Sequence, residues 1–451
     1  MNKPKKRVVI IGNGISGITC ARHIRKKDGN AEILVISGET DHFFSRTALM
    51  YIYMGHMKYE HTKPYEDWFW EKNNILLKKA WINTIDFERR ILKSADEEIG
   101  FDILILATGS KPNKFGWVGQ DLEGVQGLYS YQDLELMEKN TKGIRNAVVV
   151  GGGLIGIEMA EMLRSRNIPV TFLVREESFW DNILPTEESN LVNRHIQEHH
   201  IDLRLRTELD EILGDQNGRV KSVRTKNGEI LEAQFVGLTA GVSPNIGFLL
   251  NSGLKINRGI LVDSYFKTNV EDVYAIGDCA EFYNAPSADR KNIEQVWYTG
   301  RMHGETLAYN LTSSDAVPYK PGVWFNSAKF LDIEYQTYGQ VPPYWDESMS
   351  SFYWEDKGGK ACLRILFTKA DKSILGVNGF GWRLRHEFFD KAISEKWQLE
   401  KVILNLHKAN FNTEFHKNFH ELVLNQYNQQ FGKKLALKKS SFLQKILGSR
   451  A

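Results

Sequence analysis

Two glycine-rich segments have the residue types and spacing that bind a dinucleotide. They are Gly12-Asn13-Gly14-Ile15-Ser16-Gly17 and Gly151-Gly152-Gly153-Leu154-Ile155-Gly156. Each follows an apolar run typical of a buried strand, 8–11 or 147–150, and opens a stretch of helical character. Such glycines permit a tight turn and let backbone N–H groups approach a pyrophosphate, which the N-terminus of a helix favours electrostatically. The sequence therefore predicts two dinucleotide sites with an electron path between them.

The elements that must position these glycines form two similar strand–helix–strand units. We expect a strand over 7–12, a helix over 14–27 and a strand over 32–37, then a strand over 147–150, a helix over 153–166 and a strand over 169–174. Strands over 103–109 and 231–241 end in small-residue turns, and a short strand precedes the loop at 278. Beyond about residue 320 the chain becomes aromatic-rich and strand-like, and its C-terminal part becomes helical.

Charged residues near the second strand of each strand–helix–strand motif could contact the adenosine part of a bound dinucleotide. Glu39 lies near the position where an acidic side chain would accept hydrogen bonds from ribose hydroxyls, although Ser37 is closer to the strand end. Arg175 ends the corresponding strand of the second unit, where it suits the 2′-phosphate of NADPH. Glu176 and Glu177 follow directly and suit NADH instead. The residues therefore leave the nucleotide open, with a slight preference for NADPH.

Composition and charge limit the classes of function. The 451 residues suffice for two or three domains, and the net charge of +2 gives no indication of a nucleic-acid-binding surface. No apolar run approaches the length of a transmembrane helix, and the N-terminus lacks a signal peptide's apolar region, so we expect a cytoplasmic protein. Cys20, Cys279 and Cys362 are widely separated, which excludes a Cys-x-x-Cys redox centre. No metal site is expected, although histidines at 195, 199, 416 and 420 have helical spacing.

The order of the motifs resembles that of the pyridine nucleotide–disulfide oxidoreductase superfamily, the flavoproteins with two dinucleotide-binding domains. Besides the two fingerprints, the resemblance rests on Ala107-Thr108-Gly109, Gly241-Val242-Ser243-Pro244-Asn245 and Ala275-Ile276-Gly277-Asp278. It implies FAD at the first fingerprint, with Asp278 at its ribityl chain and pyrophosphate, and NAD(P)H at the second. The implied fold class is α/β, with two Rossmann-like domains of the three-layer ββα type and a smaller α+β C-terminal domain. The expected boundaries are 1–115 with 241–318 for FAD, 116–240 for NAD(P)H, and 319–451 for the C-terminal domain.

Within that superfamily, the segment 43–49 resembles the ferredoxin, rubredoxin and nitrite reductase-type members. The resemblance places Arg46 beside the flavin and puts Tyr51 where many relatives carry a flavin-contacting lysine. Glu158 matches a glutamate that relatives keep near the nicotinamide, although a solvated helix residue explains it equally well. Val296 and Trp297 lie at the start of a segment that resembles the helix over the flavin pyrimidine edge. The expected catalytic residues are Glu158 and Tyr51, and the expected cofactor-binding residues are Gly12, Gly14, Ile15, Ser16, Gly17, Glu39, Arg46, Ala107, Thr108, Gly109, Gly151, Gly153, Leu154, Ile155, Gly156, Arg175, Gly241, Gly277, Asp278, Val296 and Trp297.

The resemblance implies an FAD-dependent NAD(P)H oxidoreductase. Hydride would pass from the nicotinamide to flavin N5, and the electrons would pass on to a small redox protein, a nitrite reductase-type partner, a quinone or oxygen without a protein disulfide. The alternative is a redox-sensing interaction protein of the apoptosis-inducing-factor-like kind, which the unfamiliar C-terminal 60-odd residues keep open. Analogy with the family also suggests a homodimer. The basic, partly amphipathic tail from Lys433 to Ala451 suits either a membrane or carrier contact or a solvated terminus.

Overall fold

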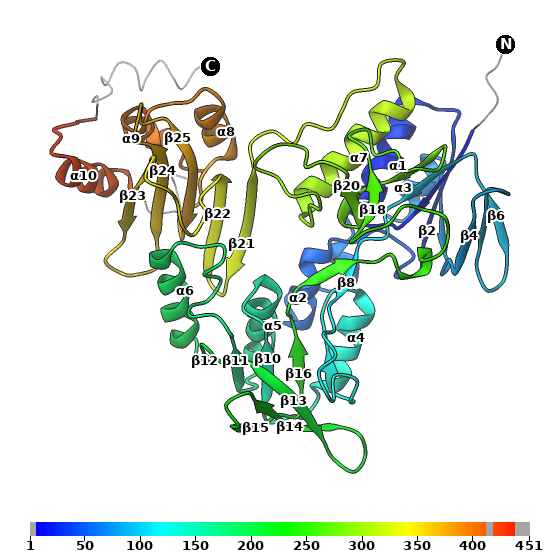
Figure 1. Cartoon of the computed structure of the whole chain (residues 1–451), viewed down its shortest axis with the longest axis horizontal. Helices are drawn as coiled ribbons and strands as arrows, with labels where there is room; N and C mark the ends of the chain where they lie inside the picture. Colours follow the sequence, from blue (N-terminus) through cyan, green and yellow to red (C-terminus); the bar gives the residue numbers. More distant parts are fainter. Residues whose placement is uncertain (1–5, 412–417, 438–451) are drawn as a thin grey trace. The chain divides into compact units, whose positions relative to one another are not determined.

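The computed structural model of the chain describes residues 6–411 and 418–437 (Figure 1). It divides into two compact units, of which the first comprises Met1–Trp180 and Ile196–Gly322. The second comprises Asp181–His195 and Val323–Ala451, so the boundary between the units falls inside helix α6 (Thr186–Glu198). Both glycine fingerprints lie in the first unit.

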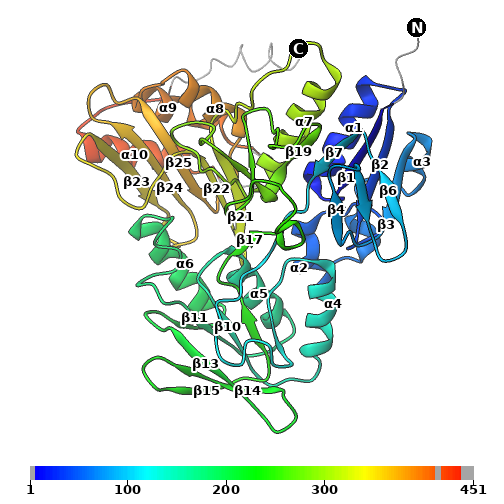
Figure 2. The same cartoon turned by 45° about the vertical axis from the view of Figure 1, so that its right-hand side comes forward.

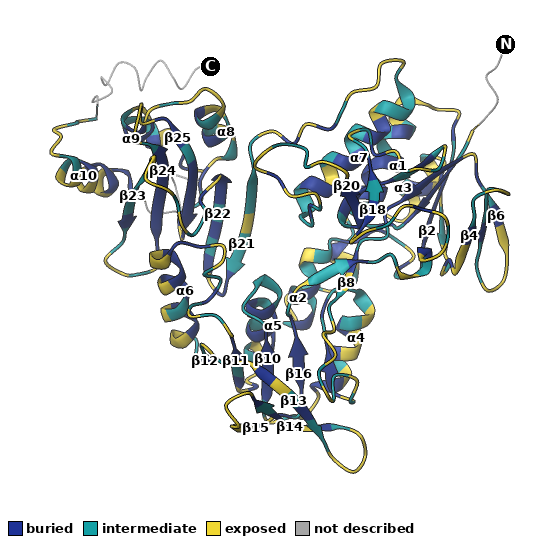
Figure 3. Cartoon of the chain, in the orientation of Figure 1, coloured by how far each residue is buried: buried dark blue, intermediate teal, exposed yellow. Residues whose placement is uncertain are grey.

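The first fingerprint belongs to a five-stranded parallel sheet with strand order β19-β7-β1-β2-β3. The strands are β1 (Arg7–Ile11), β2 (Glu32–Ser37), β3 (Ile75–Lys79), β7 (Ile103–Leu106) and β19 (Val273–Ala275). The central strands β1 and β7 are buried apolar runs, as a parallel sheet covered on both faces requires. The neighbouring strand β2 is likewise mostly buried (Figure 3). Helices α1 (Ile15–Lys27) and α7 (Trp297–Thr312) pack directly on each other (Figure 2).

The second fingerprint belongs to another five-stranded parallel sheet, of order β12-β11-β10-β16-β9. Its strands are β9 (Val125–Gln126), β10 (Ala147–Val150), β11 (Val170–Leu173), β12 (Asp202–Arg204) and β16 (Val236–Leu238). Helices α4 (Tyr131–Asn140) and α5 (Leu154–Ser165) precede and follow β10. An antiparallel sheet of β13 (Leu209–Gly214), β14 (Val220–Thr225) and β15 (Ile230–Glu232) accompanies this sheet.

The remaining elements of the first unit are short. An antiparallel sheet joins β4 (Thr84–Asp86), β5 (Ile91–Lys93) and β6 (Glu98–Gly100). Two strand pairs join β8 (Ser110–Pro112) to β17 (Val242–Pro244), and β18 (Ile260–Val262) to β20 (Ala280–Phe282). The short helices are α2 (Leu49–Tyr53), α3 (Trp68–Lys72), η1 (Arg46–Ala48), η2 (Tyr59–Thr62), η3 (Gly247–Leu249) and η4 (Gly277–Cys279).

The second unit contains an antiparallel five-stranded sheet of order β21-β22-β25-β24-β23. Its strands are β21 (Phe325–Phe330), β22 (Ile333–Gly339), β23 (Met349–Glu355), β24 (Cys362–Thr368) and β25 (Ile374–Phe380). The helices are α8 (His386–Ser394), α9 (Leu399–Asn405), η5 (Leu406–Lys408) and α10 (His420–Phe431), in addition to the first part of α6. Buried aromatic side chains such as Phe352, Trp382 and Tyr427 form much of the core of this unit.

The structure confirms the α/β fold class, and the two strand–helix–strand units match their predicted ranges to within one residue. The single strand expected over 231–241 is wrong. The chain forms β15, which pairs with β14, and then β16, which pairs with β10. The residues between them, 233–235, carry the chain from one sheet to the other. The division of the first unit into two nucleotide-binding domains stays a prediction, and residues 438–451 of the expected basic tail lie outside the described residues.

Candidate cofactor and nucleotide sites

The glycines of the first fingerprint are required by backbone contacts. Gly12 has φ +115°, and a Cβ atom there would lie 2.1 Å from the carbonyl oxygen of Ala107. A Cβ atom on Gly17 would lie 2.1 Å from the carbonyl oxygen of Gly12. At Gly14, by contrast, no heavy atom lies within 4 Å of an added Cβ atom, apart from the adjacent residues. Two glycines therefore close the turn, and the one between them borders open space.

The second fingerprint repeats this geometry. Gly151 has φ +117°, and its added Cβ would lie 2.8 Å from backbone atoms of Thr239 and Ala240. A Cβ atom on Gly156 would lie 2.3 Å from the carbonyl oxygen of Gly151, whereas Gly153 again borders open space. The structure thus builds the same turn twice, each time between a parallel strand and a helix.

The helices that follow both turns begin in the same way. Gly14 is the N-cap of α1 and Gly153 is the N-cap of α5, both with extended backbone. Neither helix start has a capping side chain or an acidic residue in its first turn. The N–H groups near Ile15 and Ser16, and near Leu154 and Ile155, are therefore suited to an anion. The open space at the N-cap and the uncapped helix start fit the pyrophosphate of a dinucleotide at each site.

Asp278 lies in the turn that follows β19, where Gly277 has φ +75°. Its Oδ2 accepts hydrogen bonds from Ser110 Oγ at 3.0 Å and from Tyr129 OH at 3.2 Å. Burial raises the pKa of the Asp278 carboxyl above its usual range, and these hydrogen bonds offset that effect only in part. An added Cβ at Gly277 would lie 2.3 Å from Ser16 Oγ, so this turn directly adjoins the first fingerprint.

Arg46 and Glu39 form a bidentate ion pair. Arg46 Nη1 donates to Glu39 Oε1 at 2.7 Å, and Nη2 donates to Oε2 at 2.6 Å. Nη1 also donates to the carbonyl oxygen of Tyr129, whose ring lies 4.5 Å from the guanidinium carbon. Glu39 Oε1 accepts a further hydrogen bond from the backbone N–H of Tyr131. The carboxylate thus faces protein donors, and its expected ribose contact stays a prediction.

The remaining expected residues at the first site adjoin the same turns. Ala107 N–H donates to the carbonyl oxygen of Ile11, and Thr108 Oγ1 donates to the carbonyl oxygen of Asn245. Gly109 has φ +70° and Gly241 has φ +88°, and the carbonyl oxygen of Gly241 accepts from Asn113 N–H. Val296 is the N-cap of α7 and Trp297 is its first residue, with no capping side chain and no acidic residue in the first turn.

Tyr51 and Glu158 lie on two helices that pack on each other, α2 and α5. Arg166 Nε, beyond the end of α5, donates to the carbonyl oxygen of Tyr53 at 3.0 Å, and its guanidinium lies over the Tyr53 ring. The half-exposed Tyr51 ring stacks on His56 at 6.2 Å. Burial, with a smaller contribution from the charge of Glu161, raises the pKa of Glu158 to about 7. A carboxyl with a pKa this high titrates near neutral pH, and its expected role at the nicotinamide stays a prediction.

Two arginines stand beside the end of β11. Val174, the residue after the strand, is fully buried, so no acidic side chain occupies that position. Arg175 Nε donates to Glu176 Oε1 at 2.7 Å, and Arg206 Nη2 lies 3.1 Å from Glu177 Oε1. The backbone N–H of Arg206 donates to the carbonyl oxygen of Glu176, which brings the two arginine-bearing segments together. Both arginine side chains are more than 70 % exposed.

All three cysteines are free and buried. Cys279 Sγ lies 3.4 Å from the carbonyl oxygens of Leu106 and Ile276, and burial raises the pKa of its thiol. Burial likewise raises the pKa of Cys20 and of Cys362. Burial therefore favours the protonated thiol over the reactive thiolate at all three positions.

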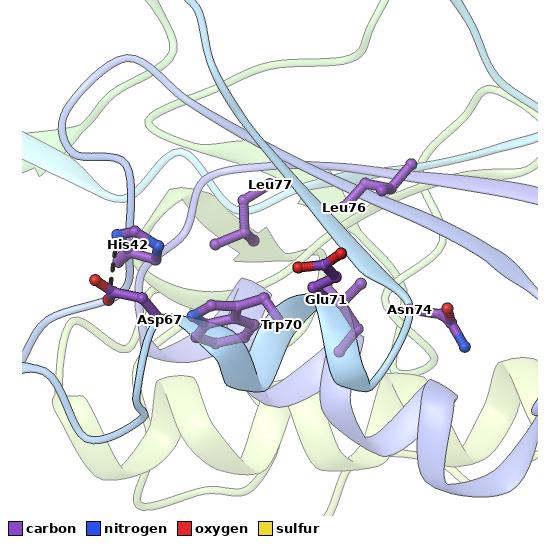
Figure 4. A pocket seen from close by; sticks show the side chains of 8 residues that line it. His42, Asp67, Trp70, Glu71, Asn74, Leu76 and Leu77 are labelled. Atoms are coloured by element: carbon purple, nitrogen blue, oxygen red, sulfur yellow. Dashed lines mark ion pairs between the residues drawn. The ribbon is translucent and has the colours of Figure 1, made fainter.

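A surface hollow of about 280 Å³ lies beside α3 and β3, and no fingerprint residue lines it (Figure 4). His42 Nδ1 lies 3.6 Å from Asp67 at one end of it, and Trp70 forms part of its wall. The residues around it are His42, Asp67, Trp70, Glu71, Asn74, Ile75, Leu76 and Leu77. None of them belongs to the expected cofactor-binding set.

Sequence reasoning missed several residues that the structure places at these sites. Tyr129 and Ser110 donate to Asp278, Gln295 donates to Ser110, and the backbone of Arg206 donates to the residue after Arg175. His303 accepts a hydrogen bond at Nδ1 from Gly277 N–H. Gln295 directly precedes Val296 in the segment that resembles the start of the helix over the flavin, whereas the other residues belong to no recognisable motif and only their proximity in the fold identifies them. Among the described residues, no helix is long and apolar enough to cross a bilayer.

Several known proteins that are named for a nicotinamide nucleotide are similar to this chain. The chain is 31% identical over 282 residues to an NAD(P)H nitrite reductase of Bacillus subtilis (strain 168), covering 61% of this chain but only 34% of that protein. It is also 31% identical over 328 residues to an NADH oxidase of Methanocaldococcus jannaschii, covering 69% of this chain and 71% of that one. An NAD-dependent persulfide reductase from A. fulgidus has a similar structure, with a TM-score of 0.80 at 24% identity over 96% of this chain and 86% of that chain.

The family profile described as pyridine nucleotide-disulphide oxidoreductase matches residues 6–304, which include both fingerprints and Asp278. Proteins of this family are FAD-binding oxidoreductases that use NAD(P)H. The uncapped start of α1, the open space at Gly14 and the buried Asp278 fit FAD. The second fingerprint fits the nicotinamide nucleotide. The chain therefore belongs to the pyridine nucleotide-disulphide oxidoreductase family.

Proposed function

We propose that this chain is an FAD-dependent NAD(P)H oxidoreductase that passes electrons to an external acceptor without a protein disulfide. The observation that carries the proposal is the repeated turn, in which Gly12 and Gly151 have nearly the same positive φ and both helices begin uncapped. Two such sites in one compact unit suit one bound dinucleotide and one exchanging dinucleotide. The three buried cysteines support electron transfer without a thiol intermediate.

The residues of the first site would hold FAD in the following roles. The N–H groups at the start of α1 would bind the pyrophosphate, and Asp278 would accept hydrogen bonds from the ribityl chain. Arg46, fixed by Glu39 and Tyr129, places a positive charge next to this site. The N-terminus of α7, at Val296 and Trp297, supplies a partial positive charge that favours an electron-rich cofactor. When bound, FAD supplies the two-electron acceptor for the nicotinamide nucleotide.

The second site would take NADPH in preference to NADH. The residue after β11 is Val174 and not a carboxylate that could bind a ribose 2′-hydroxyl. Arg175 and Arg206 pair with Glu176 and Glu177 in this structure, and their exposed guanidinium groups would exchange these partners for a 2′-phosphate. Glu158 on α5 is our choice for the group that adjusts the charge near the nicotinamide, since its pKa lies at about 7. The role of Tyr51 as a replacement for a lysine beside the flavin is likewise part of this proposal.

The proposed acceptor rests on likeness to the matched relatives alone. The matched relatives are a nitrite reductase and an NADH oxidase, so acceptors as different as a reductase partner and oxygen belong to the proposal. A solved complex of putidaredoxin reductase with putidaredoxin shares the fold, which supports a small electron carrier as a third acceptor. The chain spans only about a third of the length of the matched nitrite reductase. Any reaction of this chain that is inferred from that whole enzyme therefore belongs to the same proposal. A cytoplasmic location and a homodimer complete it.

Anaerobic stopped-flow reduction of the purified protein tests the proposal directly. Flavin absorbance is followed with NADH and with NADPH in separate experiments, and the acceptors are then compared by the rate of reoxidation. We expect bleaching at tens per second or faster with NADPH, and slower bleaching with NADH. Protein that binds no flavin would contradict the assignment of the first site. Flavin that bleaches only over minutes with both nucleotides would favour the redox-sensing alternative, which light scattering with and without nucleotide then tests.

Gly156→Ala is the matched variant for this experiment. The added Cβ would lie 2.3 Å from the carbonyl oxygen of Gly151, so the turn of the second site must change while the first site stays intact. We expect this variant to retain FAD and to lose rapid reduction by either nucleotide.

A further inference from the structure

A buried ionic cluster in the first unit centres on Glu294, just before α7 begins. Arg290 Nη1 donates to Glu294 Oε1 at 2.8 Å, and Tyr319 OH donates to Glu294 Oε2 at 2.9 Å. His303 Nε2, on α7, lies 3.4 Å from the same Oε2. The side chains of Arg290, Glu294 and His303 are all at most 3 % exposed. Isolated buried charges are costly, so each member depends on its partners.

His303 connects this cluster to the turn that holds Asp278. The backbone N–H of Gly277 donates to His303 Nδ1 at 3.1 Å. A ring nitrogen that accepts from a backbone N–H carries no proton, so the neutral ring carries its proton on Nε2 and donates it to Glu294. The rings of Phe266 and Tyr319, at 4.9 Å and 4.6 Å, hold the imidazole in this orientation.

A second hydrogen-bonded chain links the same two segments. Gln295, the neighbour of Glu294, donates from Nε2 to Ser110 Oγ at 2.8 Å. Ser110 Oγ in turn donates to Asp278 Oδ2 at 3.0 Å. The adjacent residues Glu294 and Gln295 are therefore tied to the adjacent residues Gly277 and Asp278 by two routes. One route passes through His303 and the other passes through Ser110.

We propose that His303 is a positioning residue that fixes the Asp278 turn against the N-terminus of α7, and that it thereby raises the reduction potential of the bound flavin. The proposal rests on the proposed function, because it requires FAD between these two elements. The start of α7 brings a partial positive charge to the site, whereas the Asp278 carboxyl is already hydrogen-bonded by Ser110 and Tyr129. A reduced cofactor is richer in electrons than an oxidised one. Holding α7 close therefore favours the reduced form.

Equilibrium reduction of the FAD-loaded protein against a reference dye tests the role of His303. His303→Leu removes both hydrogen bonds, and we expect the ratio of reduced to oxidised flavin to fall about tenfold, which is ~30 mV for a two-electron couple. His303→Asn keeps an acceptor for Gly277 N–H but loses the Glu294 contact, and we expect partial rescue, to a fall of about threefold. Glu294→Gln removes the charge at the other end and should also lower the ratio about threefold.

The matched control is His420→Asn in the second unit. His420 is also buried, and its Nε2 hydrogen-bonds the carbonyl oxygen of Ile403 at 2.8 Å. This variant should leave the flavin equilibrium within twofold of the original. The proposal is overturned if His303→Leu keeps full FAD and an unchanged equilibrium, or if His420→Asn shifts the equilibrium equally. Should His303→Leu not fold, unchanged equilibria in both His303→Asn and Glu294→Gln overturn it. Failure of the proposed function has a different signature, namely unsubstituted protein that binds no flavin.

Discussion

Replacing Arg175 and Arg206 with glutamine should remove the discrimination between NADPH and NADH. Each guanidinium can form charge-assisted hydrogen bonds to a 2′-phosphate, which are worth about 1.5–3 kcal/mol each. Because both side chains are more than 70 % exposed, solvent screening favours the lower end of that range. A loss of about 1.5 kcal/mol corresponds to roughly a tenfold fall in kcat/KM for NADPH in each single variant. We expect about a hundredfold fall in the double variant.

The assay is flavin reduction measured with both nucleotides at several salt concentrations. The rate with NADH should stay within about twofold of the original, since NADH has no 2′-phosphate, and only the NADPH rate should fall steeply with salt. Arg204→Gln is the matched control, because Arg204 lies on β12 and pairs with Asp202 instead. Glu177→Gln should improve NADPH modestly by releasing Arg206. Equal losses with both nucleotides in the arginine variants, or a preference for NADH in the original chain, would refute the reasoning.

Three further outcomes are expected from other parts of the first unit. Gly17→Ala should lower the FAD content and should lower the free energy of unfolding by about 1–3 kcal/mol, because its Cβ would lie 2.1 Å from the Gly12 carbonyl oxygen. Gly14→Ala should fold normally and weaken only cofactor binding. Flavin absorbance and thermal unfolding distinguish these two outcomes. Arg46→Lys should cost about 2 kcal/mol of unfolding free energy, since lysine cannot reproduce the bidentate contact with Glu39, and equal denaturation midpoints would contradict this. Because the pKa of Glu158 is raised to about 7 in the folded chain, the folded state retains a proton that the unfolded state has lost. Stability relative to Glu158→Gln should therefore fall as the pH rises from about 4.5 to about 7, and level off above that.

The sequence predicted those parts of the sites that local backbone geometry dictates. Gly12, Gly17, Gly151 and Gly156 are predicted from their spacing between a buried strand and a helix, and the structure explains that spacing because a Cβ atom at each would meet backbone atoms. The strands and helices on either side follow from apolar periodicity and match their predicted ranges closely. The superfamily itself was identified from the order of such motifs and is confirmed by the family match.

Contacts between distant segments escaped prediction. Tyr129 and Asp278 are 149 positions apart, and neither residue type indicates the other. Arg206 adjoins Arg175 only because the chain returns along β12 beside β11. The segment 231–241 forms two strands because its first part pairs with β14 and its later part pairs with β10, in two different sheets. Periodicity within one segment cannot show with which sheet each part pairs. Such information resides in the topology and not in local patterns.

The burial of Cys20, Cys279 and Cys362 has a practical consequence for labelling experiments. All three side chains are 0 % exposed, and burial raises the pKa of each thiol. Because thiolate is the reacting form, the folded chain should behave towards maleimides as a protein without cysteine. A single cysteine introduced on an exposed position, such as Trp68 or Tyr344, would then carry a fluorophore without background. A fluorophore at either position would report changes in its own unit as nucleotide is added, without removal of any native residue from the core.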